Sequence, residues 1–181
     1  MKIDYTLRED DYLKYQLYNV AHSKQVRKRR QRSQILLPVA YLLMGASFLL
    51  LDNQIAAAIF GVVAVIWFFL IPIYIRKRYV KIYKKFNAEN YAENFNQPLS
   101  IETKSDKLHL TSPKAESEIK YNAISEIIDL GTHYLIKFTM GSVSILPVNR
   151  EVSKSVCDDL IGDIAAKSGK SVYDKTDWEW K

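Results

Sequence analysis

The chain has 181 residues, a formal net charge of +6 and a single cysteine, Cys157. One cysteine excludes an intramolecular disulfide and a cysteine-rich metal site. Residues 1–33 carry a charge of +5 and residues 76–97 carry +4, whereas residues 98–181 carry −2, so the sequence does not predict the folded basic face that nucleic-acid binding requires.

Residues 1–33 are predicted to be a cytoplasmic N-terminal segment with a strand and a helix. Ile3, Tyr5 and Leu7 are candidates for an added strand if the sheet of residues 98–170 needs the N-terminal segment. Residues 6–9 fit a capping box, and the pattern is helical from Asp10 onward. Because neither proline nor glycine occurs before Gln34, we expect this helix to continue into the apolar region that follows.

Two apolar stretches, residues 35–51 and 55–75, predict a transmembrane hairpin over residues 34–75. As helices they are roughly 26 Å and roughly 32 Å long, which suits the ~30 Å hydrocarbon core of a bilayer. A cleaved signal peptide has its apolar segment close to the N-terminus. Here the polar residues 1–33 precede the first apolar stretch, so a signal peptide is disfavoured. A buried hairpin in a soluble protein would be neither this long nor this apolar.

Basic residues flank both apolar stretches, and the short turn between them has none. Lysine and arginine accumulate on the cytoplasmic side of membrane proteins, so both termini are predicted to be cytoplasmic. The same side chains are expected to attract anionic lipid headgroups by about 1 kcal/mol each. This membrane-surface basic cluster comprises Arg27, Lys28, Arg29, Arg30, Arg32, Arg76, Lys77, Arg78, Lys81, Lys84 and Lys85.

Gly45, Ala57 and Gly61 are predicted to form the contact between the two spans. With the turn centred on Asn53, Gly45 is expected to face Gly61, and small residues four apart let helix backbones approach closely. A homo-oligomer contact would use the same residues, and this alternative stays open.

Residues 76–97 are predicted to continue the second helix beyond the membrane, and Pro98 marks the change to strands. Six short runs with a period of two, separated by turn residues, predict an antiparallel β-meander. The runs lie around Leu99–Thr103, Leu108–Leu110, Ile119–Tyr121, Ile127–Leu130, Tyr134–Phe138 and Val143–Pro147.

A helix over residues 149–167, stopped by Gly169, is expected to close the sheet. Its predicted inward face comprises Val152, Val156, Leu160, Ile161 and Ile164. The fold class is therefore an α+β membrane protein whose cytoplasmic antiparallel β-sheet is closed by a C-terminal helix. We expect residues 98–170 to fold alone, with marginal stability.

Three short motifs resemble a known family. They are Tyr121-x-x-Ile124, the strand at residues 133–138, and residues 144–149 at the start of the closing helix. Together they resemble the C-terminal domain of YcxB-like bacterial membrane proteins, which are similar to this chain over nearly its whole length. The resemblance implies a multi-pass protein of the bacterial inner membrane with a pleckstrin-homology-like cytoplasmic domain. It implies no defined activity and supplies no catalytic residue.

No arrangement of residues predicts catalysis, a cofactor or a metal ion. His22, His109 and His133 have no second ligand at helical or strand spacing, and Cys157 fits a small core residue. A pleckstrin-homology-like fold suggests inositol-lipid binding. However, the turn at residues 103–107 balances its lysines against neighbouring acids, which predicts a solvated turn.

The predicted function is that of a non-enzymatic, membrane-anchored cytoplasmic interaction module with an unknown protein partner. The alternative is a small membrane immunity or regulatory protein that acts through its hairpin. Within the tail, residues 171–181, Trp178 and Trp180 are candidate partner contacts, because the acidic residues beside them would be repelled by anionic lipid. Packing of the tail on the surface of the C-terminal domain is the other interpretation.

Overall fold

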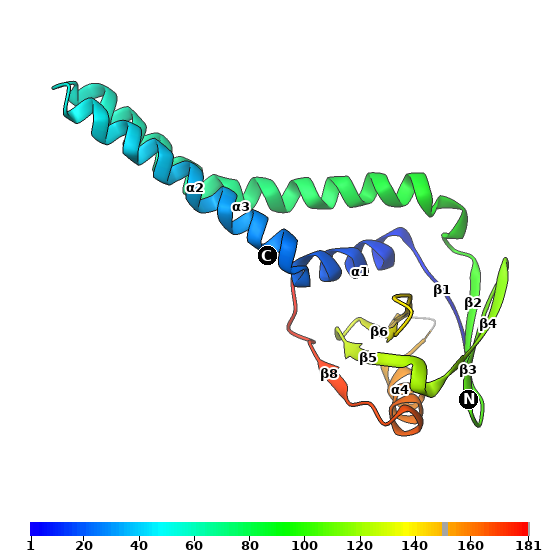
Figure 1. The fold of residues 1–181 in the computed structure, drawn as a ribbon. Coiled ribbons are helices and arrows are strands. Elements are labelled where there is room, and N and C mark those ends of the chain that lie inside the picture. Colours follow the sequence, from blue (N-terminus) through cyan, green and yellow to red (C-terminus); the bar gives the residue numbers. More distant parts are fainter. Residues whose placement is uncertain (150–151, 181) are drawn as a thin grey trace. The chain divides into compact units, whose positions relative to one another are not determined.

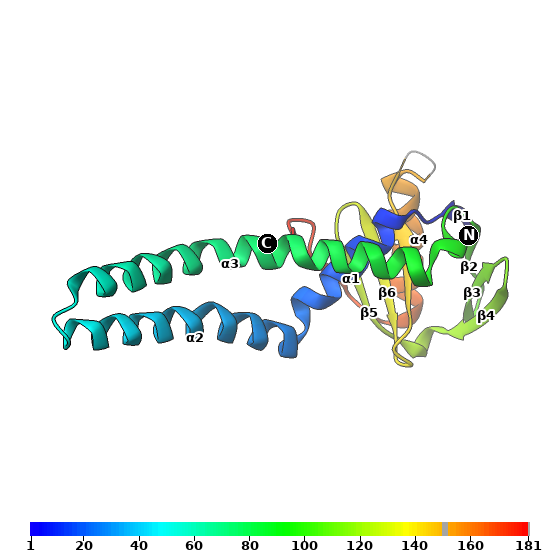
Figure 2. The ribbon, with the colours of Figure 1, turned by 90° about the horizontal axis from the view of Figure 1, so that it is seen from above.

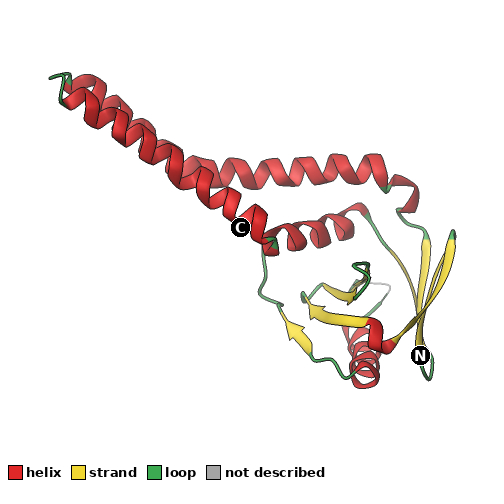
Figure 3. Ribbon diagram, in the orientation of Figure 1, coloured by secondary structure: helices red, strands yellow, loops and turns green. Residues whose placement is uncertain are grey.

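The computed structural model describes residues 1–149 and 152–180, which form two units of an α+β protein (Figure 3). The sheet unit contains Met1–Tyr15 and Lys84–Glu179, and the hairpin unit contains Gln16–Tyr83 and Trp180. The sheet unit is therefore larger than the expected domain at residues 98–170, because it includes the N-terminus and the end of the second long helix.

Sheet A of the sheet unit has four antiparallel strands in the order β1-β2-β3-β4 (Figure 1). Ile3 pairs with Ile101, and Ile101 pairs with Leu110, so apolar side chains line up across one face. The expected N-terminal strand is thus present at the edge of the sheet. The strands are β1 Lys2–Thr6, β2 Pro98–Thr103, β3 Lys107–Ser112 and β4 Ala115–Lys120.

Sheet B has the order β7-β6-β5-β8, and its last strand runs parallel to β5. All six predicted strands are present, but the meander is divided between two sheets. The short 3-10 helix η2 turns the chain between β4 and β5, so these two strands do not pair, and the described residues do not close a barrel. The elements are η2 Tyr121–Ala123, β5 Ile124–Asp129, β6 His133–Phe138, β7 Val143–Pro147 and β8 Val172–Asp174.

The core of the sheet unit lies around sheet B. Ile127 and Ile128 are adjacent on β5 and both are 0% exposed. Neighbouring residues of a strand point to opposite faces, so both faces of the sheet are covered. The helix α4, Lys154–Ser168, adds buried apolar side chains to this core and ends at Gly169, whose φ of 67° is the left-handed conformation expected of the predicted stop.

The inward face of α4 differs from the prediction at one position. Val156 is 38% exposed, whereas Cys157 is 0% exposed and fills the core. The buried stripe at residues 157, 160, 161 and 164 follows the i, i+3, i+4, i+7 pattern of a helix, and Val156 lies beside it. Residues 150 and 151 of the predicted helix start lie outside the described residues.

The hairpin unit consists mainly of α2, Lys24–Leu49, and the first part of α3, Gln54–Asn90. Both helices contain an 18-residue stretch long and apolar enough to cross a membrane. The single helix α3 also includes most of the predicted continuation over residues 76–97 and is followed by the 3-10 helix η1, Ala92–Asn94.

The N-terminal helix α1, Glu9–His22, does not continue into α2 as expected. Ser23 is extended at the boundary, and its hydroxyl accepts a hydrogen bond from the Val26 N–H. A serine that satisfies a free N–H in this way starts a new helix. The prediction of a capping box at residues 6–9 is also wrong, because Thr6 lies in β1. At the start of α1 the Asp11 carboxylate accepts a hydrogen bond from the Arg8 N–H at 2.6 Å.

Candidate functional site

Three residues of the predicted basic cluster line one cavity of about 430 Å³ between α2 and α3. They are Arg29 and Arg30 of α2 and Arg78 of α3. The other members of the cluster do not line it. Lys84 and Lys85 belong to the sheet unit. There Lys84 forms an ion pair with Asp10 at 3.7 Å, and Lys85 forms one with Glu89 at 3.6 Å. The other residues of the basic cluster that do not line the cavity are Arg27, Lys28, Arg32, Arg76, Lys77 and Lys81.

Helical spacing explains why these arginines line the same cavity. On α3 the lining positions 67, 71, 74, 75 and 78 recur on one face of the helix. On α2 Arg29 and Ser33 are one turn apart on the facing side. Figure 2 shows the two helices farther apart at their basic ends than at the turn. The cavity thus runs from apolar side chains to charged ones.

Trp180, one of the two candidate partner contacts, packs within the hairpin unit. It is 9% exposed, and its Nε1–H donates to the Arg76 carbonyl at 3.3 Å. Its ring lies 5.9 Å from the Tyr79 ring and 5.3 Å from the Arg30 guanidinium carbon. Trp180 therefore packs on the protein itself, although on the hairpin unit and not on the surface of the C-terminal domain. Trp178, in the sheet unit, is half-buried.

The small residues of the hairpin contribute unequally to helix contact. A side chain at Gly45 would meet the Ala57 carbonyl oxygen and the Phe60 Cβ, each at 3.3 Å. A Cβ atom at Gly61 would meet nothing within 4 Å. Close approach therefore occurs at Gly45. Aromatic contacts that were not predicted from the sequence extend this approach, since the Phe48 and Phe60 rings stack with their centroids 5.4 Å apart.

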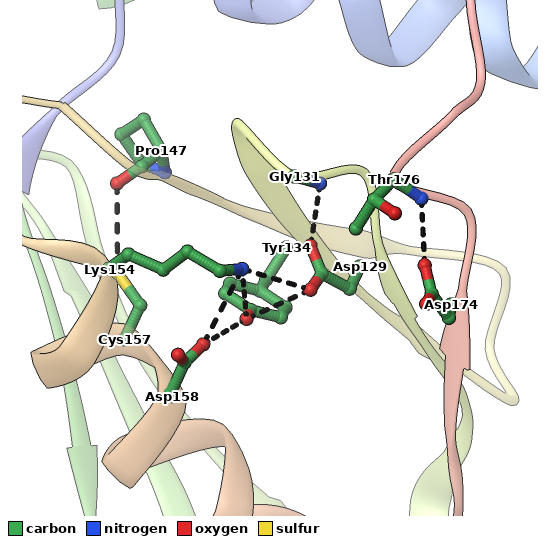
Figure 4. Close-up of polar contacts among 9 residues, drawn as sticks. All are labelled: Asp129, Gly131, Tyr134, Pro147, Lys154, Cys157, Asp158, Asp174 and Thr176. Carbon is green, nitrogen blue, oxygen red and sulfur yellow. Dashed lines mark hydrogen bonds and ion pairs between the residues drawn. The ribbon is translucent and has the colours of Figure 1, made fainter.

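A polar cluster joins α4 to sheet B (Figure 4). The Lys154 ammonium donates to the Tyr134 hydroxyl and to an Asp129 carboxylate oxygen, each at 3.1 Å. The Tyr134 hydroxyl is also within hydrogen-bond distance of Asp129 and Asp158. In the same region Cys157 lies against the Pro147 carbonyl, with its sulfur 3.9 Å from the oxygen.

The environment of this cluster disfavours proton transfer at neutral pH. Burial and the hydrogen bond to Asp158 raise the pKa of Tyr134, and the hydrogen bond to Tyr134 raises that of Lys154. Burial raises the pKa of the Cys157 thiol to about 11. A general base or nucleophile works best with a pKa near the operating pH, so the cluster fits a structural link.

A second polar link joins α1 to β6. The His133 Nε2 lies 2.8 Å from an Asp11 carboxylate oxygen, and both side chains are mostly buried. Burial opposes ionisation of Asp11, but hydrogen bonds from His133 and the Arg8 N–H outweigh it and hold the pKa of Asp11 below its usual value. This pair therefore fastens the N-terminal segment to sheet B.

The lysines of the turn at residues 103–107 are occupied. Both Lys104 and Lys107 form ion pairs with Glu118, at 3.2 Å and 2.5 Å. Hydrogen bonds from these lysines lower the pKa of Glu118 to about 2. An anionic ligand at this turn would have to compete with the carboxylate, which supports the expectation of a solvated turn.

A groove of about 320 Å³ opens between sheets A and B. It includes residues of β4 and β7, which are both edge strands of their sheets. The alternation of polar and apolar residues along β4 is visible in the sequence. The sequence did not predict that β7 lies on the other side of the groove. Apolar and serine side chains line the groove, among them Leu99, Leu110, Ser117, Ile119, Phe138, Ser142, Val143 and Ile145.

Comparison of the chain with family models, curated proteins and solved structures finds no match.

Proposed function

We propose that this protein is a membrane-anchored, non-catalytic interaction module whose sheet unit binds an extended segment of a partner protein. The groove between the two sheets carries this proposal. Consecutive residues of the edge strand β7, Val143, Ser144 and Ile145, line it, and an edge strand leaves backbone donors and acceptors free on one side. As part of this proposal, the protein is a member of the YcxB-like family, and its sheet unit is a pleckstrin-homology-like domain.

The lining of the groove supports an extended peptide as the occupant. On β4, Ala115, Ser117 and Ile119 line the groove, whereas Glu116 and Glu118 do not. A peptide strand added to a sheet edge gains affinity from backbone hydrogen bonds and specificity from pockets for alternate side chains. The alternating apolar and serine lining offers such pockets.

The anchor in this proposal is the hairpin of α2 and α3, inserted in the bacterial inner membrane with both termini cytoplasmic. The two long apolar helices and their basic flanks support this topology.

Cysteine labelling tests the topology. In a Cys157→Ala background, a cysteine at Asn53 should react with an impermeant maleimide added to intact cells. Cysteines at Lys2 and Ser168 should react only after the membrane is permeabilised. Labelling of either terminus from outside would contradict the proposed topology.

Site-specific photo-crosslinking in cells tests the groove. A photoreactive residue at Ser117 should capture one defined peptide of a partner, identified by mass spectrometry of the adduct, and Leu110→Glu should abolish this adduct. Glu116 is the matched control, since it is adjacent on β4 but outside the groove. Equal adducts from both positions, or none from Ser117, would refute strand binding in the groove.

The alternative is an immunity or regulatory protein that acts through the hairpin. The open space beside Gly61 favours it, because a partner helix could approach α3 closely there. A photoreactive residue at Val62 distinguishes the two functions. An adduct from Val62 and none from Ser117 would favour the alternative.

A further inference from the structure

The cavity between α2 and α3 combines a charged end with an apolar end. Arg29, Arg30 and Arg78 form the charged end, and no aspartate or glutamate is among its lining residues. Arg29 and Arg78 have no ion-pair partner within residues 1–149 and 152–180. Planar guanidinium groups bind phosphate through paired N–H donors, so this end suits a phosphate group.

The apolar end begins inside the predicted span. Trp67 and Ile71 lie on the same helix face as Arg78, and roughly 16 Å of helix separates Trp67 from Arg78. A small soluble anion would leave this apolar length unused. An amphiphile with a phosphate at one end and a hydrocarbon chain at the other fills both parts.

The C-terminal tail holds one of the arginines in place. The Trp180 ring lies 5.3 Å from the Arg30 guanidinium carbon, and its own N–H is bound to the backbone of α3 at Arg76. A cation held against an aromatic ring loses less freedom when it binds a ligand. The charged end is therefore partly organised before a ligand arrives.

We infer that this cavity binds one anionic glycerophospholipid. The phosphate lies between Arg29, Arg30 and Arg78, and the start of an acyl chain lies along Trp67 and Ile71. This inference rests on the proposed insertion of the hairpin in a membrane. It adds a defined lipid site to the general attraction that a basic flank exerts on anionic lipid, and basic pockets between membrane helices bind such headgroups.

Native mass spectrometry of the full chain, released from nanodiscs, tests the site. Nanodiscs of phosphatidylcholine with a small fraction of phosphatidylglycerol should yield a complex with one retained phosphatidylglycerol. Arg29→Gln with Arg78→Gln should lower retention about tenfold or more, because two charge-assisted contacts are lost. The matched control, Arg27→Gln with Lys77→Gln, removes the same charge from the same two helices outside the cavity and should change retention less than about twofold.

Three results would overturn the inference. Equal losses in the two double variants would indicate diffuse attraction only. Equal retention of phosphatidylcholine would indicate an apolar cavity without headgroup selection. Displacement of the lipid by millimolar sn-glycerol 3-phosphate would indicate a site for a free phosphate ester. Cysteine labelling at Asn53 in each variant shows whether the hairpin is inserted, so a failure of the anchor is separated from a failure of the lipid site.

Discussion

Replacing Ile3 by aspartate should unfold sheet A in the full-length protein while the hairpin stays helical. Ile3 is 5% exposed and pairs with the fully buried Ile101. The substitution loses about 1.5–3 kcal/mol of apolar burial and adds the desolvation of a carboxylate. The total is a large fraction of the 5–15 kcal/mol that stabilises a typical domain. Hydrogen exchange of peptides from β2 and β3 measures the effect.

Asp4 provides the control for this experiment. It is the next residue of β1, and its side chain is 73% exposed. Asp4→Ala should change stability by less than about 0.5 kcal/mol and leave the exchange of sheet A unchanged. Unaltered exchange in Ile3→Asp would mean that β1 does not support the sheet. The fragment 98–170 would then be expected to fold alone, as the sequence suggested.

Replacing Gly45 by leucine should lower the stability of the hairpin by about 1–3 kcal/mol, as overpacking typically does. An added Cβ already lies 3.3 Å from a backbone oxygen of Ala57 and from the Phe60 Cβ, and the rest of a leucine side chain needs more room. Thermal unfolding in detergent micelles, followed by circular dichroism, gives the difference.

Gly61→Leu is the matched substitution on the other helix. An added Cβ there meets nothing within 4 Å, so the loss should be much smaller than for Gly45→Leu. Equal losses at the two positions would contradict the assignment of close approach to Gly45.

The local elements were largely predictable from the sequence. The period of two located all six central strands, and the length of the apolar runs located the two long helices. The sequence did not predict the features that depend on residues distant in the chain or on a single hydrogen bond. The strand β8 has only three residues and pairs with β5 in parallel, so no local turn signals it. The break at Ser23 depends on one hydroxyl that accepts one N–H.

The candidate site was predictable in composition but not in geometry. Counting charges identified the basic cluster, yet only the divergence of α2 and α3 brings Arg29, Arg30 and Arg78 to one cavity. Similarly, Gly45 and Gly61 are equivalent in the sequence pattern, and only the close packing of Ala57 and Phe60 against Gly45 distinguishes them. The tail was ambiguous because a tryptophan serves equally well in an interface and in a core.

The pairing of β1 with β2 has a consequence for biogenesis. These adjacent strands are separated in the chain by the whole hairpin, so sheet A cannot form until the ribosome has made both apolar helices. Closing so long a loop has an entropic cost. Insertion of the two helices as a hairpin lowers this cost, because it returns the chain to the side of the membrane on which β1 lies. In the proposed topology, translocon insertion would therefore precede completion of the sheet.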